Sequence, residues 1–423
     1  MSKNTISKCI NLVIVIHLYN ILVKLIDKVF LQIFSIFNNR INNFRKNRIS
    51  LLNKIKNELK DYRNNVWFHA ASLGEYEIAV PLIRKIKKKY NCKIILTFFS
   101  ESGFKLESRI GEIDKTFYFP IDTKENAQKF LDTVKPKMTF FIKSELWPNF
   151  LIELKKRKIR SYLVESKFEK NNKYLNGILG NFFINKLRIF NKIFTIDKES
   201  EIILKKKKIN NVIVSGSLKI ERAKELVKSK YTNKVIEEFI GNDYCIVCGS
   251  TWEIDEKIIF NFIKKYKKKE LKWVIAPHNT SKNNIKRIIN TLNEKHLLYS
   301  KNKIRNAQCN VLIIDTIGHL KNIYKYSTIS YVGGGMGNTG LHNILEACVH
   351  SVPVVIGKNY KKFKESIDLV NSKGIVSVKN QFEFDYEIEK LIDNVEYRTK
   401  KVNIIRKYLE SQTYATNNII KYL

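Results

Sequence analysis

Short apolar runs rich in β-branched and aromatic residues recur along the chain from Val66 onward, separated by longer amphipathic stretches. Runs of this length are typical of strands, whereas the longer stretches, such as Ala79 to Tyr90 and Ala127 to Val134, are typical of helices. A first series of strands is predicted at 66–71, 94–100, 138–142, 161–164 and 193–196. A second series is predicted at 212–215, 244–249, 272–276, 311–315, 328–332 and 353–356.

Strands that alternate with helices in this way predict an α/β fold of two successive doubly wound, Rossmann-like domains. The 423 residues suffice for two full cores. Ligands are expected in the crevice at the carboxyl ends of the strands. The predicted divisions are a membrane anchor (1–36), an amino-terminal domain (37–210), a carboxy-terminal domain (211–398) and closing helices (399–423).

The first 36 residues differ from the rest in their apolar content. Cys9 to Val23 is mostly apolar, three charged residues follow, and Val29 to Phe37 is apolar again. This leaves no clean apolar span of about 20 residues and no small-residue cleavage site. The segment therefore predicts an anchor helix that either spans the membrane or lies in its interface, helped by the basic tract Arg40 to Lys54. An amphipathic core helix is the alternative.

The net charge of +37 points to anionic partners, either nucleic acid or a membrane surface. The lysines are diffuse and no nucleic-acid motif accompanies them, so the charge also fits solvated helix faces, and nucleic acid is not expected. The six cysteines are too scattered for a disulfide framework. Cys245 and Cys248 have metal-ligand spacing but lie in an apolar run without a second pair, so core packing is expected.

In the amino-terminal half, Ser72 and Gly74 follow the first predicted strand and place Glu75 in the first turn of a helix. A carboxylate there could deprotonate a substrate hydroxyl, although a glutamate that complements a helix dipole is the simpler explanation. A second candidate segment, Lys143 to Asn149, follows the strand at 138–142. A third, Gly216 to Lys219, offers a lysine at the expected domain junction, where it could meet an anionic donor.

The carboxy-terminal half contains a glycine run from Gly333 to Gly340, followed by His342, Asn343 and Glu346. Glycines at the start of a helix leave room for a phosphate to approach the backbone N–H groups. A carboxylate one turn further along the helix can accept the hydroxyls of a ribose. An ordinary strand-to-helix turn is the alternative for the glycines alone.

These segments together resemble the family of 3-deoxy-D-manno-octulosonic acid (Kdo) transferases of lipid A assembly. His69-Ala-Ala-Ser-Leu-Gly-Glu75 is similar to the family's His-Ala-x-Ser-x-Gly-Glu, and Glu145-Leu-Trp-Pro-Asn149 to its Glu-Leu-Trp-Pro-Asn. Five further elements follow in the family's order: Gly216-Ser-Leu-Lys219, Ser250-Thr251, Asp315-Thr-Ile-Gly318, Gly333-Gly334 and His342-Asn343-x-x-Glu346-Ala347.

The resemblance implies a GT-B glycosyltransferase that moves Kdo from CMP-Kdo to a lipid A precursor, with inversion and without a metal or another cofactor. It implies an anionic membrane surface as partner, at the cytoplasmic face of the inner membrane. Glu75 would be the general base, and Lys219 would stabilise the transition state. The residues implied in binding substrate or nucleotide are Ser72, Gly74, Glu145, Ser250, Thr251, Pro277, His278, Ile317, Gly318, His319, Asn343, Ile344, Leu345 and Glu346.

Three positions depart from the family pattern. Lys143 stands where many members have a glutamate, Trp252 follows Ser250-Thr251 in place of histidine, and Pro277-His278-Asn279 replaces Pro-Arg-His. The last change removes a permanent cation, for which Lys282 is the nearest substitute in sequence. Two rival functions are a GT-B transferase that uses another nucleotide sugar and a non-catalytic basic protein of the membrane surface.

Overall fold

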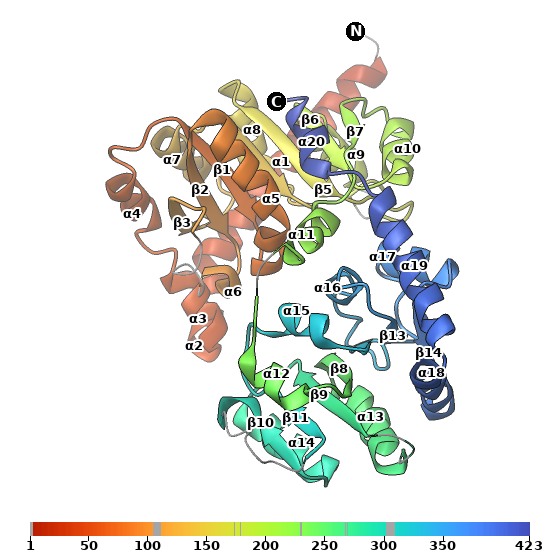
Figure 1. The fold of residues 1–423 in the computed structure, drawn as a ribbon. Coiled ribbons are helices and arrows are strands. Elements are labelled where there is room, and N and C mark those ends of the chain that lie inside the picture. Colours follow the sequence, from red (N-terminus) through yellow and green to blue (C-terminus); the bar gives the residue numbers. More distant parts are fainter. Residues whose placement is uncertain are drawn as a thin grey trace. The chain divides into compact units, whose positions relative to one another are not determined.

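The computed structural model describes residues 3–104, 111–172, 174–177, 179–228, 231–266, 268, 270–301 and 309–423, with side chains from residue 14 except at 102 and 103. The chain forms two compact units, coloured along the sequence in Figure 1. The first unit contains Met1–Arg222 and Thr413–Leu423, and the second contains Ala223–Gln412.

The first unit is built on a parallel sheet of order β3-β2-β1-β4-β5-β6-β7. Alternate residues of its strands enter opposite cores: Val66 and Phe68 pack on one face, while Trp67 packs on the other. The chain builds outward from β1 in one direction and then returns to build from β4 in the other, which makes β1/β4 the topological switch point. The strands are β1 (Asn65–Ala70), β2 (Lys93–Phe98), β3 (Lys115–Tyr118), β4 (Met138–Ile142), β5 (Arg160–Ser166), β6 (Lys192–Thr195) and β7 (Val212–Val214).

Helices cover both faces of this sheet because each presents an apolar stripe toward it (Figure 1). They are α4 (Leu51–Glu58), α5 (Leu73–Tyr90), α6 (Glu101–Phe104), α7 (Lys124–Val134), α8 (Pro148–Lys156), α9 (Gly180–Leu187), α10 (Lys198–Lys206), α11 (Leu218–Leu226) and α20 (Ala415–Ile420).

The second unit repeats this architecture with the order β10-β11-β9-β8-β12-β13-β14, so its switch point lies between β8 and β12. Its strands are β8 (Tyr244–Thr251), β9 (Leu271–Pro277), β10 (His296–Leu298), β11 (Val311–Ile313), β12 (Ile329–Val332), β13 (Val354–Gly357) and β14 (Val376–Val378). Its helices are α12 (Lys234–Ile240), α13 (Glu253–Lys265), α14 (Lys282–Leu292), η3 (Tyr299–Lys301), α15 (Leu320–Ile323), η4 (Tyr324–Tyr326), α16 (Leu345–Cys348), α17 (Lys364–Asn371), α18 (Gln381–Asp393) and α19 (Val395–Ser411).

The two predicted parallel sheets are confirmed, with one strand assigned to the wrong series. The run at 212–215 was expected to open the second domain, but β7 pairs with β6 and completes the first sheet. Apolar pattern alone cannot tell which sheet a three-residue strand joins. The sequence also missed β3, β10 and β14, which are only three or four residues long. Helices are confirmed within 399–423, although α20 joins the first unit.

The amino-terminal segment is helical and belongs to the first unit. It consists of α1 (Lys3–Leu25), η1 (Ile26–Phe30) and α2 (Leu31–Phe37), followed by α3 (Asn39–Lys46). Among the described residues, no helix combines the length and apolar character that crossing a bilayer requires. The prediction of core packing for the Cys-x-x-Cys pair is confirmed, because Cys245 and Cys248 are buried in β8 as free thiols.

A buried carboxylate attaches the carboxy-terminal helix to the first unit. Glu221 on α11 is 4% exposed, and its two oxygens accept the backbone N–H of Thr416 at 2.9 Å and the Thr416 hydroxyl at 2.6 Å.

We predict that Glu221→Ala lowers the free energy of unfolding of the first unit by about 1–3 kcal/mol, because it leaves a buried amide and a buried hydroxyl without an acceptor. Urea titration followed by circular dichroism measures this loss. Glu199→Gln, on the exposed side of α10, is the matched control and should change stability by less than about 0.5 kcal/mol. Equal stability of the two variants would contradict the prediction.

Candidate functional site

The loops at the carboxyl ends of β1 and β4 bring two of the predicted segments together at the switch point of the first unit. The β1 loop leads through Ser72 into α5, and the β4 loop contains Lys143 and Glu145 before α8 begins at Pro148. Adjacent strands place these loops side by side, and Lys143 and Glu145 both act electrostatically on Glu75. The structure therefore gathers the amino-terminal candidates into one cluster.

Glu75 is half-buried in the first turn of α5, and its Oε2 accepts the backbone N–H of Ala71 at 2.6 Å. Burial raises the pKa of Glu75, and the charge of Glu145 raises it further. Lys143, the Ala71 N–H and His69 oppose this rise. A carboxylate whose pKa is raised toward neutrality is a stronger base, which suits a group that removes a proton from a hydroxyl.

A buried chain of side chains holds Glu145 in place. Trp67 donates its indole N–H to the Thr97 hydroxyl at 2.9 Å, and Thr97 lies 2.9 Å from Nδ1 of His69. His69 Nε2 lies 3.4 Å from Oε2 of Glu145, which also accepts the indole N–H of Trp147 at 2.9 Å. Among the described residues, Nε2 of His69 has no hydrogen-bond partner, so it only lies near the Glu145 carboxylate.

The space next to Gly74, in the turn before Glu75, is open to a side-chain atom. Ser72 precedes α5, and its carbonyl accepts the N–H groups of Glu75 and Tyr76, both at 3.1 Å. A Cβ built on Gly74 would meet only the Ser72 hydroxyl, at 4.0 Å. The glycine is thus not required by the packing of the chain itself, and a ligand could approach there.

The segment with Lys219 lies in the first unit, three residues before the boundary that follows Arg222. Glu165, buried at the end of β5, accepts the Ser217 hydroxyl at 2.7 Å and the Leu218 N–H at 2.6 Å, and so caps the start of α11. Burial raises the pKa of Glu165. Arg222, one turn after Lys219, pairs with Glu77 of α5 at 3.0 Å, which brings the first turns of α11 and α5 close together.

Four loops meet at the carboxyl edge of the second sheet, because they follow the neighbouring strands β11, β9, β8 and β12. They carry the candidates for holding the nucleotide. Ser250 has a left-handed backbone (φ 54°), and Thr251 accepts the N–H of His278 on its carbonyl at 3.0 Å, next to Pro277 at the end of β9. Two predicted segments, Ser250-Thr251 and Pro277-His278, are therefore in direct contact.

Trp252, His278 and His342 form an aromatic cluster above this edge. The indole N–H of Trp252 donates to Nε2 of His342 at 3.0 Å, and the ring of His278 stacks on both, with centroid distances of 4.6 Å. Burial, together with the neighbouring His278, lowers the pKa of His342 to about 4. Because Nε2 accepts a hydrogen bond, His342 is neutral with its proton on Nδ1. The three stacked rings therefore form a flat surface without a formal charge.

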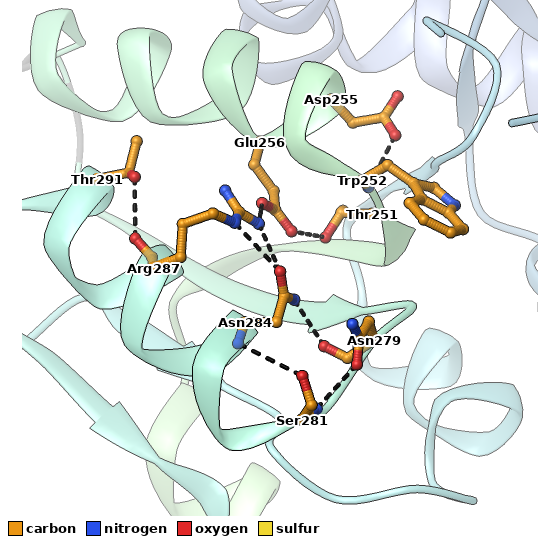
Figure 2. A network of polar contacts seen from close by, with 9 residues as sticks. All are labelled: Thr251, Trp252, Asp255, Glu256, Asn279, Ser281, Asn284, Arg287 and Thr291. Atoms are coloured by element: carbon orange, nitrogen blue, oxygen red, sulfur yellow. Dashed lines mark hydrogen bonds and ion pairs between the residues drawn. The ribbon is translucent and has the colours of Figure 1, made fainter. Parts of the chain in front are cut away.

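A polar network supports the loop that carries His278 (Figure 2). Glu256, buried on α13, accepts the Thr251 hydroxyl at 3.0 Å and forms an ion pair with Arg287 of α14. Arg287 also donates to Asn284, whose side chain donates to the carbonyl of Asn279 at 2.6 Å. Arg287, and not Lys282, is thus the cation whose hydrogen bonds reach this loop through Asn284. The charge of Arg287 is paired with Glu256.

The glycine run has a packing explanation that the sequence did not supply. A Cβ on Gly333 would come within 2.5 Å of the Ser250 carbonyl oxygen, and one on Gly335 within 3.0 Å of the Gly357 N–H. These glycines allow backbone to lie against backbone, so room for a phosphate is not needed to explain them. The Gly334 N–H is fixed by Asp255, which accepts it at 2.8 Å and accepts the Tyr331 hydroxyl at 2.7 Å.

Asn343 and Glu346 do lie together, as predicted, but the helix there is short. Asn343 precedes α16 and donates to Oε1 of Glu346 at 3.2 Å. Ile344 and Leu345, at 1% and 0% exposure, fill the core, so that a ligand can meet only their backbone. In the β11 loop, Ile317 is 82% exposed, Gly318 has a left-handed backbone (φ 100°), and His319 lies against Tyr299.

Several supporting residues escaped the sequence reasoning because they lie far from the motifs along the chain or look like ordinary polar positions. The acids at 255 and 256 follow Thr251-Trp252 with the spacing of a helix start, which is a signal that could have identified them. In the described part of the chain, no group of three or more His, Cys, Asp or Glu side chains is arranged to hold a metal ion. The supporting residues are Thr97, Asp122, Glu165, Asp255, Glu256, Asn284 and Arg287.

Comparisons with known structures support the fold. A UDP-GlcNAc 2-epimerase from Neisseria meningitidis matches with a TM-score of 0.61 and 17% identity over 85% of this chain and 99% of that one. A glycosyltransferase from Rickettsia africae matches with a TM-score of 0.56 and 12% identity over 85% and 98%. The expected two-domain GT-B fold is confirmed.

Comparisons of sequence concern the family. Residues 43–222 match the family model described as 3-deoxy-D-manno-octulosonic-acid transferase (kdotransferase). A 3-deoxy-D-manno-octulosonic acid transferase of Aquifex aeolicus is 27% identical over 84% of this chain and 94% of that protein, and one of Rickettsia felis is 27% identical over 77% and 71%. A bifunctional glycosyltransferase/methyltransferase of Fusobacterium nucleatum is 27% identical over 86% of this chain, which spans 57% of that relative's length. Residues 43–222 thus match the model of this family, and most of the chain is similar to 3-deoxy-D-manno-octulosonic acid transferases.

Proposed function

We propose that the protein transfers Kdo from CMP-Kdo to a phosphorylated lipid A precursor in lipopolysaccharide biosynthesis, at the cytoplasmic face of the inner membrane. The observation that carries the proposal is Glu75, a half-buried carboxylate with a raised pKa at the switch point of the first unit. It lies in the segment that resembles the family's His-Ala-x-Ser-x-Gly-Glu motif, within the residues that match the family model.

In the proposed reaction, Glu75 takes the proton of an acceptor hydroxyl as the hydroxyl oxygen forms a bond to the anomeric carbon of Kdo. The bond from that carbon to the phosphate oxygen of CMP breaks, and CMP leaves with the electron pair. A single displacement of this kind inverts the anomeric centre. Lys219 would offset charge that develops on the leaving phosphate, so the mechanism proposed here routes no step through a metal ion.

The second unit supplies the proposed donor site. Glu346, which accepts a hydrogen bond from Asn343, would accept ribose hydroxyls, and the exposed Ile317 would offer an apolar contact. The neutral cluster of Trp252, His278 and His342 offers flat rings instead of the cation that the family's Pro-Arg-His pattern would provide. Donor binding in this chain therefore depends more on stacking and less on ion pairing.

The amino-terminal helices supply the proposed membrane contact. Apolar side chains at helical spacing are exposed along α1, η1 and α2, with exposures from 40% to 81%. Such a stripe, followed by the basic tract at 40–54, suits the interface of a membrane with anionic lipids. The members of this apolar face are Ile14, Leu18, Ile21, Leu22, Leu25, Ile26, Val29, Phe30, Ile33, Phe34, Ile36 and Phe37.

The second candidate is transfer of a sugar from a uridine nucleotide, because the fold is shared with a UDP-GlcNAc 2-epimerase. Purified protein with CMP-Kdo and tetra-acylated lipid A precursor tests the first proposal through the gain in mass of the lipid. Competition by CMP and by UDP separates the two candidates. Binding of UDP but not of CMP, together with no gain in mass from CMP-Kdo, would favour the second.

Glu75→Gln is expected to lower the transfer rate by about 10²–10⁴ while CMP binding stays within about two-fold of the wild type. The amide is nearly the same size as the carboxylate, and its oxygen can still accept the Ala71 N–H, but it cannot take a proton. Single-turnover assays measure the rate. Glu199→Gln serves as the control, and near wild-type turnover of Glu75→Gln would assign the base to another residue.

Glu346→Ala is expected to weaken CMP binding by about 1.5–3 kcal/mol, through loss of charged hydrogen bonds to the ribose. Isothermal titration calorimetry with CMP measures the change. Glu396→Ala, an exposed first-turn glutamate of α19, is the matched control. An unchanged dissociation constant in folded Glu346→Ala would remove this segment from the donor site.

For the membrane contact, Ile21→Gln is expected to weaken binding to phosphatidylglycerol vesicles by about five-fold, since one apolar side chain contributes about 1 kcal/mol or more when buried. Co-sedimentation measures the fraction bound. Ile202, 46% exposed on α10 compared with 64% for Ile21, provides the control variant Ile202→Gln. Equal binding by the two variants would argue against this face as the contact.

A further inference from the structure

The inner side of α1 makes specific polar contacts with Asp122 and with the start of α8, next to the loop that carries Glu145. The Tyr19 hydroxyl donates to Oδ2 of Asp122 at 2.7 Å, and Asn20 Oδ1 accepts the side-chain amide of Asn149 at 2.8 Å. Lys24 pairs with Glu125 at 3.0 Å on the exposed side. A helix that served only as a tether would not need oriented hydrogen bonds to the domain behind it.

Asp122 links this helix to the start of α8. Its two oxygens accept the backbone N–H groups of Asn149 and Phe150, each at 3.1 Å, and its carbonyl accepts the Asn149 amide at 2.5 Å. Asp122 is 2% exposed, and burial raises its pKa to about 7, while the hydrogen bonds from Tyr19, Asn149 and Phe150 work to lower it. One buried carboxylate thus joins α1 to the first turn of α8.

The residues that precede α8 extend this link to Glu75. Trp147, immediately before Pro148, donates to Glu145 and packs against Phe99 and Phe119, with centroid distances of 5.2 and 4.9 Å. Glu145 in turn raises the pKa of Glu75. A shift of the α8 start would move Trp147 and Glu145 with it, because the two residues lie next to that turn.

We propose that Tyr19 and Asp122 are positioning residues, through which the first helix holds the Glu145 loop in register with Glu75. This proposal rests on the proposed transferase function, and it gives α1 a role beyond attachment to a lipid surface. The helix therefore presents its apolar face outward and fixes the candidate acceptor site with its polar face.

Tyr19→Phe tests the proposal, because it removes only the hydroxyl and keeps the ring beside Phe182. In full-length protein with detergent-dispersed acceptor, we expect kcat to fall about ten-fold with the KM for CMP-Kdo unchanged, since a small misplacement of a catalytic group costs this much or more. A tether acts only on membrane-embedded acceptor, so the loss in detergent separates the two roles. The matched control is Tyr266→Phe, whose hydroxyl has no hydrogen-bond partner among the described residues.

The acid limb of the pH–rate profile gives a second readout. Glu145 raises the pKa of Glu75, whereas Lys143, His69 and the Ala71 N–H lower it. If Tyr19→Phe lets Glu145 move away, the limb shifts to lower pH, which a general loss of stability would not cause. An unchanged kcat and an unchanged limb would overturn the proposal.

Hydrogen exchange of the Asn149 and Phe150 amides provides a readout that does not require turnover. Tyr19→Phe and Asn20→Ala should raise exchange there by about ten-fold or more, while Tyr266→Phe should not. If the wild-type protein shows no transfer but exchange is faster in the two variants, the transferase function is refuted and the link between α1 and α8 is retained. Faster exchange with unchanged kcat would refute the positioning role, and unchanged exchange would refute the link itself.

Discussion

Buried carboxylates that accept backbone N–H groups at the start of helices hold the loops of both units in position. Asp122 does this for α8, Glu165 for α11 and Asp255 for the turn into α13 and the glycine run. A buried charge is unfavourable unless hydrogen bonds and a helix dipole compensate it, so each of these acids tolerates only one loop geometry. The candidate chemistry depends on that geometry, because Glu145, Lys219 and His342 are carried by the loops and helices so fixed.

The same constraint explains how a chain with a net charge of +37 keeps its candidate sites ordered. The lysines are spread over helix faces, where water screens them, whereas the acids that matter lie inside and meet amides, hydroxyls or Arg287. In the second unit the neutral Trp252, His278 and His342 replace charge with stacking. The residues that give the chain its net positive charge are therefore different from those that order its candidate sites.

The sequence predicted the parallel sheets and most of their strands, because buried parallel strands are continuous apolar runs. It also singled out Glu75 and Glu145, which follow predicted strands within a few residues, and Asn343 and Glu346, which follow the glycine run; their roles stay predictions. It failed where the deciding contact spans the chain. The run at 212–215 was assigned to the wrong sheet. For Gly333 and Gly335 of the glycine run, the sequence could not show that the backbones of Ser250 and Gly357 leave no room for a side chain.

The order of the elements, the turn residues that end each strand, and the motifs that resemble the family can be read from the amino-acid sequence alone, because they depend on neighbours along the chain. The contacts of Tyr19 with Asp122, of Arg287 with Glu256 and of Trp252 with His342 become known only from the packed fold. Each of these contacts joins residues separated by many positions, and its partner is chosen by how the helices pack on the sheet. No local pattern encodes that choice, since many lysines, arginines and acids along this chain would have been equally plausible partners.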